Sequence, residues 1–260
     1  MSLSFPLHKA TESLKLELQK RSVDTIIPCQ VKMAMDVSGS FDDEHRQGYT
    51  QDLMNRFMPF ALIFDKDGVI DSYTFASKAG RLPKIDKDNF DSYIQNKVIN
   101  CYGYNGGTCY KPVLELIAED ASPHDIVTGG QDGVAAKPAG FFGKLFGKKD
   151  IQEQPAISPT TIKGEVEKEL VFFVTDGDAS DTDQAKKFIQ KMGKDNIFFV
   201  FISVGDQDIK LFKESFEDTP YSIYLKLTKD QIRDLHSWSD EKMYDLLLQP
   251  SLIAWMDKQV

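Results

Sequence analysis

The spacing of apolar positions along the chain predicts strands separated by helices. Val31, Met33, Met35 and Val37 alternate with other residue types, a period of two that is typical of a strand. The runs at 170–175 and 197–204 are apolar almost throughout, as strands are when both faces of a parallel sheet are covered. Further strands are predicted at 69–76 and 222–227.

Helical spacing fills the intervals between these strands. The segment 7–21 places Leu14 and Leu18 on one face, and 44–64 starts with helical spacing but becomes ambiguous at Pro59. Helices alternating with strands predict an α/β fold, with a doubly wound, mostly parallel central sheet flanked by helices. The other helices are expected at 89–99, 110–118, 181–192 with Asp181 as its N-cap, 209–216 and 241–258.

The length of 260 residues suits one main domain. We expect an N-terminal helical extension at 1–25 and a single domain at 26–260. Periodicity fails between 122 and 164, and such a long irregular stretch inside a domain predicts a flexible insertion. Its basic and aromatic part, Phe141–Lys149, suits contact with an anionic membrane surface or with a partner, although its glycines disfavour a stable helix.

Composition narrows the class of protein. With 40 Asp and Glu against 31 Lys and Arg, the chain has no overall basic field, so no nucleic-acid partner is expected. The three cysteines and four histidines lack the spacing of metal ligands, and reduced cysteines are expected. No signal-like start and no run of about 20 apolar residues is present, so we expect a soluble cytoplasmic protein.

The stretch FDKDGVIDS, from Phe64 to Ser72, resembles the opening motif of the haloacid dehalogenase superfamily. That resemblance implies a phosphatase with Asp65 as nucleophile and Asp67 as general acid/base. Asp and Gly also suit tight turns, so the same residues serve equally well as a connection into the strand at 69–76. A phosphatase would leave a more specific motif without a role. We therefore keep the phosphatase only as the alternative function.

That motif is DVSGS, at the end of the first predicted strand. Asp36, Ser38 and Ser40 stand at i, i+2 and i+4, so one carboxylate and two hydroxyls project to the same side. Oxygen ligands of this kind suit a hard cation such as magnesium. Three groups from one loop cannot fill an octahedron, so other loops must contribute.

Two other loops offer oxygen ligands at the same edge of the predicted sheet. Thr108 follows two glycines and precedes a helix, and Asp176 follows the buried strand at 170–175. The carboxyl ends of parallel strands form the edge where doubly wound sheets bind ligands. The predicted metal-site residues are Asp36, Ser38, Ser40, Thr108 and Asp176.

The order Asp-x-Ser-x-Ser, Thr, Thr-Asp-Gly resembles the metal-ion-dependent adhesion site of von Willebrand factor A (vWA) domains. The stretches FALIFDKDGVIDSYTF, YNGGTCYKPVLELI and VFFVTDGDASD are similar in particular to vWA domains of bacterial tellurium-resistance and stress-response proteins. The similarity covers roughly residues 26–256, apart from the insertion.

This resemblance implies a function without catalysis. Ser38, Ser40 and Thr108 would contact magnesium directly, while Asp36 and Asp176 would hold coordinated waters. A protein partner would then complete the coordination with an Asp or Glu carboxylate. One departure from the family pattern is the acidic run at 41–44, which could repel that carboxylate or recruit a second cation.

Overall fold

A six-stranded sheet carries the fold, in the order β3-β2-β1-β6-β7-β8. Neighbouring strands pair in parallel, except for the antiparallel pair β2 and β3. The chain builds outward from β1 in one direction and then from β6 in the other, so strand order reverses between β1 and β6. The strands are β1 (Cys29–Asp36), β2 (Ile70–Phe75), β3 (Ala79–Ile85), β6 (Lys168–Thr175), β7 (Ile197–Val204) and β8 (Ser222–Leu227).

The computed structural model describes residues 5–23, 25–121, 126–127, 161–162, 168–192, 196–213 and 221–257. The chain divides into the unit Met1–Ser122 with Val166–Val260, and the unit Pro123–Glu165. In the second unit, β4 (Ile126–Val127) and β5 (Thr161–Ile162) pair antiparallel. The rest of the expected insertion, including Phe141–Lys149, lies outside the described residues.

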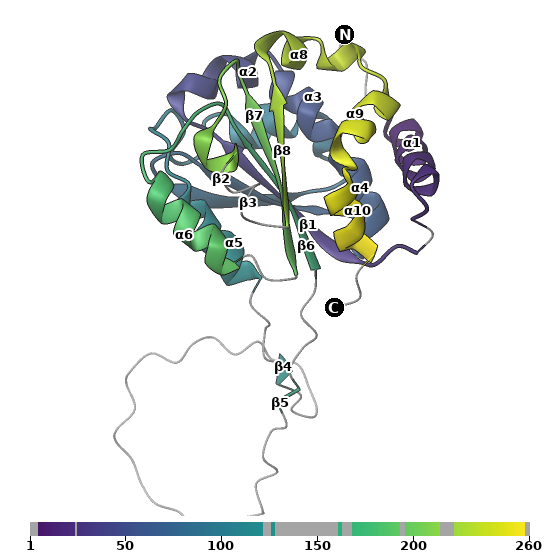
Figure 1. Cartoon of the computed structure of the whole chain (residues 1–260). Helices are drawn as coiled ribbons and strands as arrows, with labels where there is room; N and C mark the ends of the chain where they lie inside the picture. The colour runs from purple at the N-terminus through teal and green to yellow at the C-terminus, as the bar shows by residue number, and fades with distance from the viewer. Residues whose placement is uncertain are drawn as a thin grey trace, which may run out of the picture. The chain divides into compact units, whose positions relative to one another are not determined.

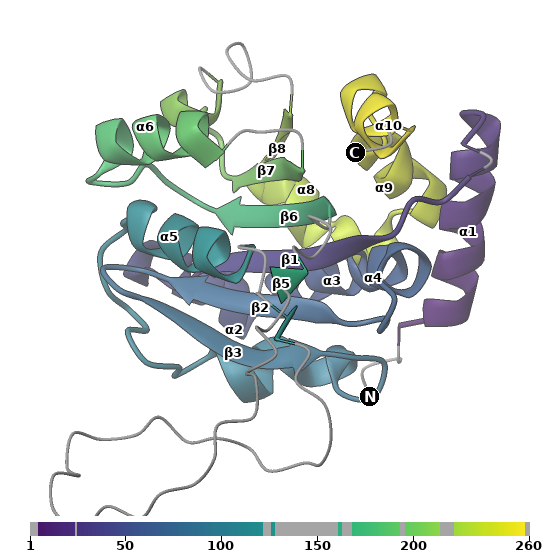
Figure 2. The same ribbon diagram turned by 90° about the horizontal axis from the view of Figure 1, so that it is seen from below.

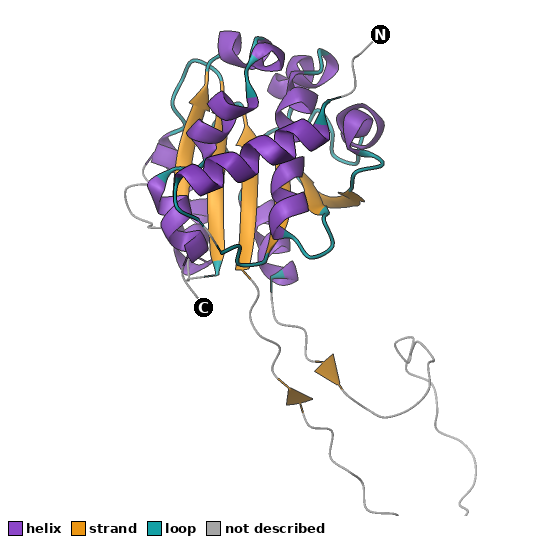
Figure 3. Ribbon diagram, turned by 90° about the vertical axis from the view of Figure 1, so that its right-hand side faces the viewer, coloured by secondary structure: helices purple, strands orange, loops and turns teal. Residues whose placement is uncertain are grey.

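Helices cover both faces of the six-stranded sheet. One layer holds α5 and α6, and the other holds α1, α3, α4, α9 and α10 (Figures 1 and 2). Figure 3 shows the strands side by side with helices packed across them. Consecutive residues of β6 face opposite helix layers: the Phe172 ring stacks on Phe57 at 4.1 Å, and the Phe173 ring lies 5.3 Å from Tyr110, the residue before α5. Both faces of the sheet are therefore buried, as the apolar strands predict.

The described helices have the following bounds. They are α1 (Leu7–Lys20), α2 (Asp42–Arg46), α3 (Tyr49–Asn55), α4 (Met58–Phe64), α5 (Lys111–Asp120), α6 (Thr182–Met192), α8 (Lys229–Arg233), α9 (Asp240–Leu247) and α10 (Pro250–Asp257). Over the described ranges, no helix combines the length and the hydropathy needed to cross a bilayer.

Three expected helices differ from the observed ones. The segment 44–64 forms α2, α3 and α4, because Gly48 adopts a φ of 84° and ends the first of them. The expected helix at 89–99 is instead a 3₁₀ turn at Phe90–Ser92 followed by a π turn at Ile94–Val98. The expected closing helix at 241–258 is α9 followed by α10, which begins at Pro250, where the missing N–H costs no hydrogen bond.

The sequence pattern did not predict β3 or α8. β3 is an edge strand that contains Pro83 and is mostly exposed, so it lacks the apolar periodicity of the inner strands. α8 has five residues and is set by a capping box, in which the Gln231 amide donates to Thr228 Oγ1 at 3.2 Å. The expected helix at 209–216 lies partly outside the described residues.

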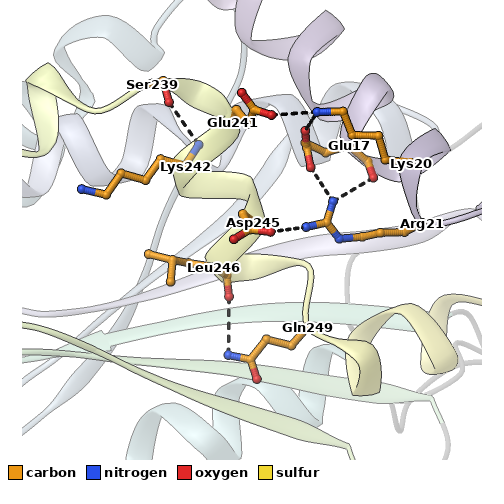
Figure 4. Close-up of polar contacts among 9 residues, drawn as sticks. All are labelled: Glu17, Lys20, Arg21, Ser239, Glu241, Lys242, Asp245, Leu246 and Gln249. Atoms are coloured by element: carbon orange, nitrogen blue, oxygen red, sulfur yellow. Dashed lines mark hydrogen bonds and ion pairs between the residues drawn. The ribbon is translucent and has the colours of Figure 1, made fainter.

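The N-terminal helix α1 belongs to the same unit as the sheet. Leu14 and Leu18 are buried in the core beside α4 and α9. Figure 4 shows the polar border of this contact: Lys20 Nζ lies 2.7 Å from Glu241, and Arg21 lies 2.6 Å from Asp245. Because solvent-exposed ion pairs each contribute less than about 1 kcal/mol, the leucines provide most of the attachment.

Candidate metal centre

The candidate site lies at the carboxyl edge of the sheet, where strand order reverses. β1 ends at Asp36 and its neighbour β6 ends at Thr175, while α2 lies at the same end of the sheet (Figure 1). A third segment joins them, because Ser38 bridges to Gly106 and the Gly39 amide donates to the Gly106 carbonyl at 3.0 Å. The structure thus brings together the three segments that the sequence singled out.

Asp36 is fully buried and holds the first segment in shape. Its Oδ1 accepts a hydrogen bond from the Ser38 amide at 2.7 Å, and its Oδ2 accepts one from the Thr175 hydroxyl. Burial raises the pKa of Asp36 to about 6, although these hydrogen bonds favour the ionised form. Both carboxylate oxygens therefore have protein partners, and the side chain fixes the loop that carries the serines.

A row of oxygens crosses from the first segment to the β6 loop. Ser38 Oγ lies 3.3 Å from Ser40 Oγ, and Ser40 Oγ donates to Asp176 Oδ1 at 3.0 Å. Burial raises the pKa of Asp176, the Ser40 hydrogen bond opposes this rise, and the negative charge of Glu44 adds to it. Ser40 itself is exposed. The two hydroxyls and one carboxylate thus lie together at an accessible edge.

The glycine loop approaches the sheet closely. The Asn105 amide donates to the Val37 carbonyl at 2.8 Å. A Cβ added at Gly106 would lie 3.2 Å from Ala76 Cβ and 3.2 Å from the Ser77 amide nitrogen, which is tighter than a relaxed contact. A side chain at position 106 would therefore push this loop away from the end of β2. The glycine is needed to bring the next residues up to the site.

Thr108 is held between this loop and the segment after β6. Its carbonyl accepts hydrogen bonds from the Ser180 amide at 2.9 Å and from the Ser180 hydroxyl at 3.1 Å. The next residue after Ser180, Asp181, accepts hydrogen bonds from the amides of Tyr110 at 2.8 Å and Lys111 at 2.9 Å, where α5 begins. The segment after β6 thus fixes the chain at Thr108 and at the two residues that begin α5.

Asp181 stands at the N-cap position of α6, as expected, but its side chain hydrogen-bonds to the start of another helix. Its backbone carbonyl begins α6 by accepting from Gln184 and Ala185, while its carboxylate reaches across to α5. The carboxylate is bound there because the first amides of α5 have no partner within the helix and the N-terminal end of the helix dipole is positive. Sequence spacing could not show this, because the partner is about 70 residues away.

His45 supports the site, although no motif identifies it. The ring is fully buried, with Nε2 2.7 Å from the Asp36 carbonyl oxygen and Nδ1 2.8 Å from Thr50 Oγ1. A carbonyl oxygen can only accept, so Nε2 carries the proton and Nδ1 accepts from the Thr50 hydroxyl. Burial lowers the pKa of His45 to about 4, which keeps the ring neutral. His45 therefore ties α2 and α3 to the end of β1.

The acidic run beside the site contains residues with different surroundings. Asp42 accepts from the Tyr104 hydroxyl at 2.6 Å and forms an ion pair with Arg46 at 2.8 Å. These contacts lower the pKa of Asp42. Glu44, in contrast, has a carboxylate oxygen, Oε2, that is buried without a hydrogen-bond partner. An ionised oxygen in this condition is costly unless a positive charge or a donor comes near it.

The residues at this edge fit a hard divalent cation. Serine and threonine hydroxyls together with carboxylates are the oxygen ligands that such ions take. Within the described ranges, no three His, Cys, Asp or Glu side chains are arranged to hold a metal by themselves. The hydroxyls of Ser38, Ser40 and Thr108 would therefore have to share the ligation with Asp36 and Asp176. We call these five residues the cation site.

Asp65 and Asp67 form a turn at the other edge of the sheet. The apolar run before them is the end of α4, and β2 begins after them. Asp65 Oδ1 accepts from the Asp67 amide at 2.8 Å, and Oδ2 accepts from the Val31 amide at 3.2 Å. Gly68 follows with a φ of 67°. Asp65, Asp67 and Gly68 thus form the turn between α4 and β2.

The fold is that of von Willebrand factor A domains, and the ordered set of site residues resembles their metal site. Residues 28–137 match the family model named vWA-TerF-like, described as the vWA found in the TerF C terminus. A curated relative is the uncharacterized protein YcbR of Bacillus subtilis (strain 168), which is 20% identical over 240 residues, covering 91% of this chain and 81% of the relative.

Solved structures share the fold at low sequence identity. A von Willebrand factor type A protein from Catenulispora acidiphila matches with a TM-score of 0.51 and 12% identity, over 90% of this chain and 44% of that one. Proximal thread matrix protein 1 from the mussel byssus matches with a TM-score of 0.50 and 13% identity, over 85% and 48%. The chain spans about half the length of these two structures.

Proposed function

We propose that this protein is a non-catalytic, magnesium-dependent protein-interaction module. Ser38, Ser40 and Thr108 would ligate the cation directly, and Asp36 and Asp176 would act through coordinated waters. The observation that carries the proposal is the row of oxygens from Ser38 through Ser40 to Asp176, which joins two separate loops at the sheet edge. Such a row offers a cation several oxygens without rearrangement of the backbone.

The charge of this ligand set supports binding of a partner carboxylate. Because the direct ligands are neutral hydroxyls, the cation retains much of its attraction for an incoming anion. A partner's Asp or Glu side chain would complete the octahedron. The protein would then associate with its partner only when the cation is present.

An exposed aromatic residue in the loop that carries Gly106 supports a macromolecular partner. The Tyr102 side chain is 73% exposed and lies in the same loop as Gly106. Lys78 Nζ donates to its hydroxyl at 2.8 Å, which positions the ring. Exposed tyrosines next to charged groups are common in protein interfaces. Truncation of Tyr102 to alanine should therefore weaken partner binding without altering cation affinity.

The match to the TerF-like vWA family supports a role in a bacterial tellurium-resistance or stress-response system. We propose a cytoplasmic location for this role. Nothing in the site has the character of a tellurium ligand, so the module would act through its partner. The part of the chain most suited to a membrane surface, Phe141–Lys149, lies outside the described residues.

Calorimetric titration with MgCl₂ tests the proposal. Wild type should bind one magnesium ion, Ser38→Ala should lose most of the affinity, and Ser13→Ala on α1 should match wild type. Association is measured with the immobilised protein in bacterial extract, in magnesium and in EDTA. Partners retained in magnesium by wild type and absent with Ser38→Ala support the proposal. Equal binding of magnesium by wild type and Ser38→Ala would refute the assigned site.

The phosphatase alternative has its own test. It requires magnesium-dependent hydrolysis of p-nitrophenyl phosphate that is lost in Asp65→Asn. We expect no hydrolysis above background, because both oxygens of Asp65 are occupied by backbone amides. Hydrolysis that Asp65→Asn abolishes would establish the enzyme instead.

A further inference from the structure

Tyr110 joins two loops of the cation site, although it belongs to no part of the motif. It stands two residues after Thr108 and immediately before α5, and its side chain is buried. Its hydroxyl donates a hydrogen bond to the carbonyl of Gly177, the residue after Asp176. One side chain thus ties the segment that carries Thr108 to the segment that carries Asp176.

Aromatic neighbours hold the Tyr110 ring in one position. The ring stacks on Phe212 with the centroids 5.5 Å apart, and it meets the rings of Phe75 and Phe173 edge to face at 5.7 and 5.3 Å. A ring packed on several sides cannot turn or shift without opening the core around it. The hydroxyl is therefore a fixed point to which the Gly177 carbonyl is attached.

A second hydroxyl, that of Thr175, continues this connection to the first segment of the site. It donates to Asp36 Oδ2 and also lies 3.3 Å from the Gly177 carbonyl oxygen. A hydroxyl has one proton, so these two acceptors compete for it. Because Tyr110 donates to the Gly177 carbonyl, the proton of Thr175 is left for Asp36. Asp36 Oδ1 in turn accepts from the Ser38 amide at 2.7 Å.

We propose that the hydroxyls of Tyr110 and Thr175 are positioning groups that make the cation site selective for magnesium over calcium. This inference rests on the proposed function. Neither hydroxyl would touch the ion; both fix the loops that carry its ligands. Magnesium demands near-ideal octahedral geometry at about 2.0–2.1 Å, whereas calcium accepts longer and more variable distances of about 2.3–2.6 Å. Loops that cannot move apart therefore favour the smaller ion.

The first test compares Tyr110→Phe with Tyr73→Phe. Both variants remove the hydroxyl of a buried tyrosine and keep its ring, but the Tyr73 hydroxyl donates to Asp120 at 2.7 Å, at the other end of α5. Affinities for MgCl₂ and CaCl₂ are measured by calorimetry, and folding is checked by thermal unfolding in EDTA.

The two ions should respond differently to the loss of the Tyr110 hydroxyl. We expect Tyr110→Phe to lower magnesium affinity about 10-fold, the smaller effect seen when residues that support metal ligands are removed. Calcium affinity should fall by less than about threefold, because calcium tolerates displaced ligands. Tyr73→Phe should leave the ratio of the two affinities as in wild type.

A second pair of variants isolates the hydroxyl of Thr175. Thr175→Ser retains the donor to Asp36 and should retain the ratio of magnesium to calcium affinity. Thr175→Val has nearly the same size without a donor, and it should lower the ratio as Tyr110→Phe does. This pair also decides the question if Tyr110→Phe does not fold.

The outcomes separate the selectivity from the proposed function. If wild type binds no magnesium, the proposed function fails and the selectivity fails with it. If wild type binds magnesium but binds calcium as tightly, or if the ratio is unchanged in Tyr110→Phe or Thr175→Val, only the positioning role is refuted. An equal loss of both ions in Tyr110→Phe would also refute it, by showing a general loosening of the fold. A matching fall of the ratio in Tyr73→Phe would do the same.

Discussion

Replacement of Asp181 by alanine should destabilise the domain more than its position at the start of α6 suggests. The carboxylate accepts from the amides of Tyr110 and Lys111 at 2.8 and 2.9 Å, where α5 begins. Loss of an N-terminal cap costs about 1 kcal/mol, and loss of an anion from the positive end of a helix costs up to about 1 kcal/mol more. The free energy of unfolding should therefore fall by about 2 kcal/mol.

Thermal unfolding in EDTA measures this loss without a contribution from bound cation. For a domain of this size, 1 kcal/mol corresponds to about 2–4 °C, so Tm should fall by about 4–8 °C. Asp183→Ala is the matched control: Asp183 is exposed in the first turn of α6 and its loss removes only a helix-dipole interaction. If Asp181→Ala lowers Tm no more than Asp183→Ala does, the cap between the two loops does not exist in solution.

Three further predictions concern the surroundings of the site and the attachment of α1. His45→Gln retains an amide donor near the Nε2 position and should keep cation affinity. The shorter His45→Asn cannot reach the Asp36 carbonyl and should weaken cation affinity. Equal affinities of the two variants in calorimetry would contradict the role of His45 in holding the end of β1. The pKa of Asp36 is raised from 3.8 to about 6 in the folded state. Without cation, the free energy of unfolding should therefore fall by about 3 kcal/mol as the pH rises from about 4 to about 6. Cation binding should weaken below about pH 6, where Asp36 is protonated. In urea unfolding as a function of pH, Asp36→Asn should lack this slope, and a slope unchanged in the variant would refute the assignment. Leu14→Ala should cost about 2–5 kcal/mol and Glu241→Gln less than about 1 kcal/mol, because Leu14 is buried and the Glu241 side chain is 68% exposed; similar costs would show that the ion pairs attach α1.

The inner strands and the layers of the fold could be predicted because burial on both faces imposes its pattern on consecutive residues. Phe172 and Phe173 both had to be apolar, since they face opposite helix layers. β3 has no such requirement: it is an exposed edge strand, and its sequence carries no period. The lengths of the helices were less predictable, because a left-handed glycine at position 48 divides a segment whose apolar residues keep helical spacing beyond it.

The candidate site was predictable to the extent that its residues lie at strand ends. Asp36 and Asp176 adjoin β1 and β6, and the parallel register of those strands brings their ends together. His45 gave no comparable signal, since its importance depends on how α2 packs against β1. The partners of Asp181 were likewise hidden, because they are set by contact between distant loops.

The location of a bound cation tests the central claim most directly. Crystals grown with MnCl₂ would reveal the ion through its anomalous scattering. The account predicts a peak beside Ser38 Oγ and Ser40 Oγ, within reach of Thr108 and on the side of Asp176. A peak beside Asp65 instead, with none at the serines, would contradict the account and favour the phosphatase.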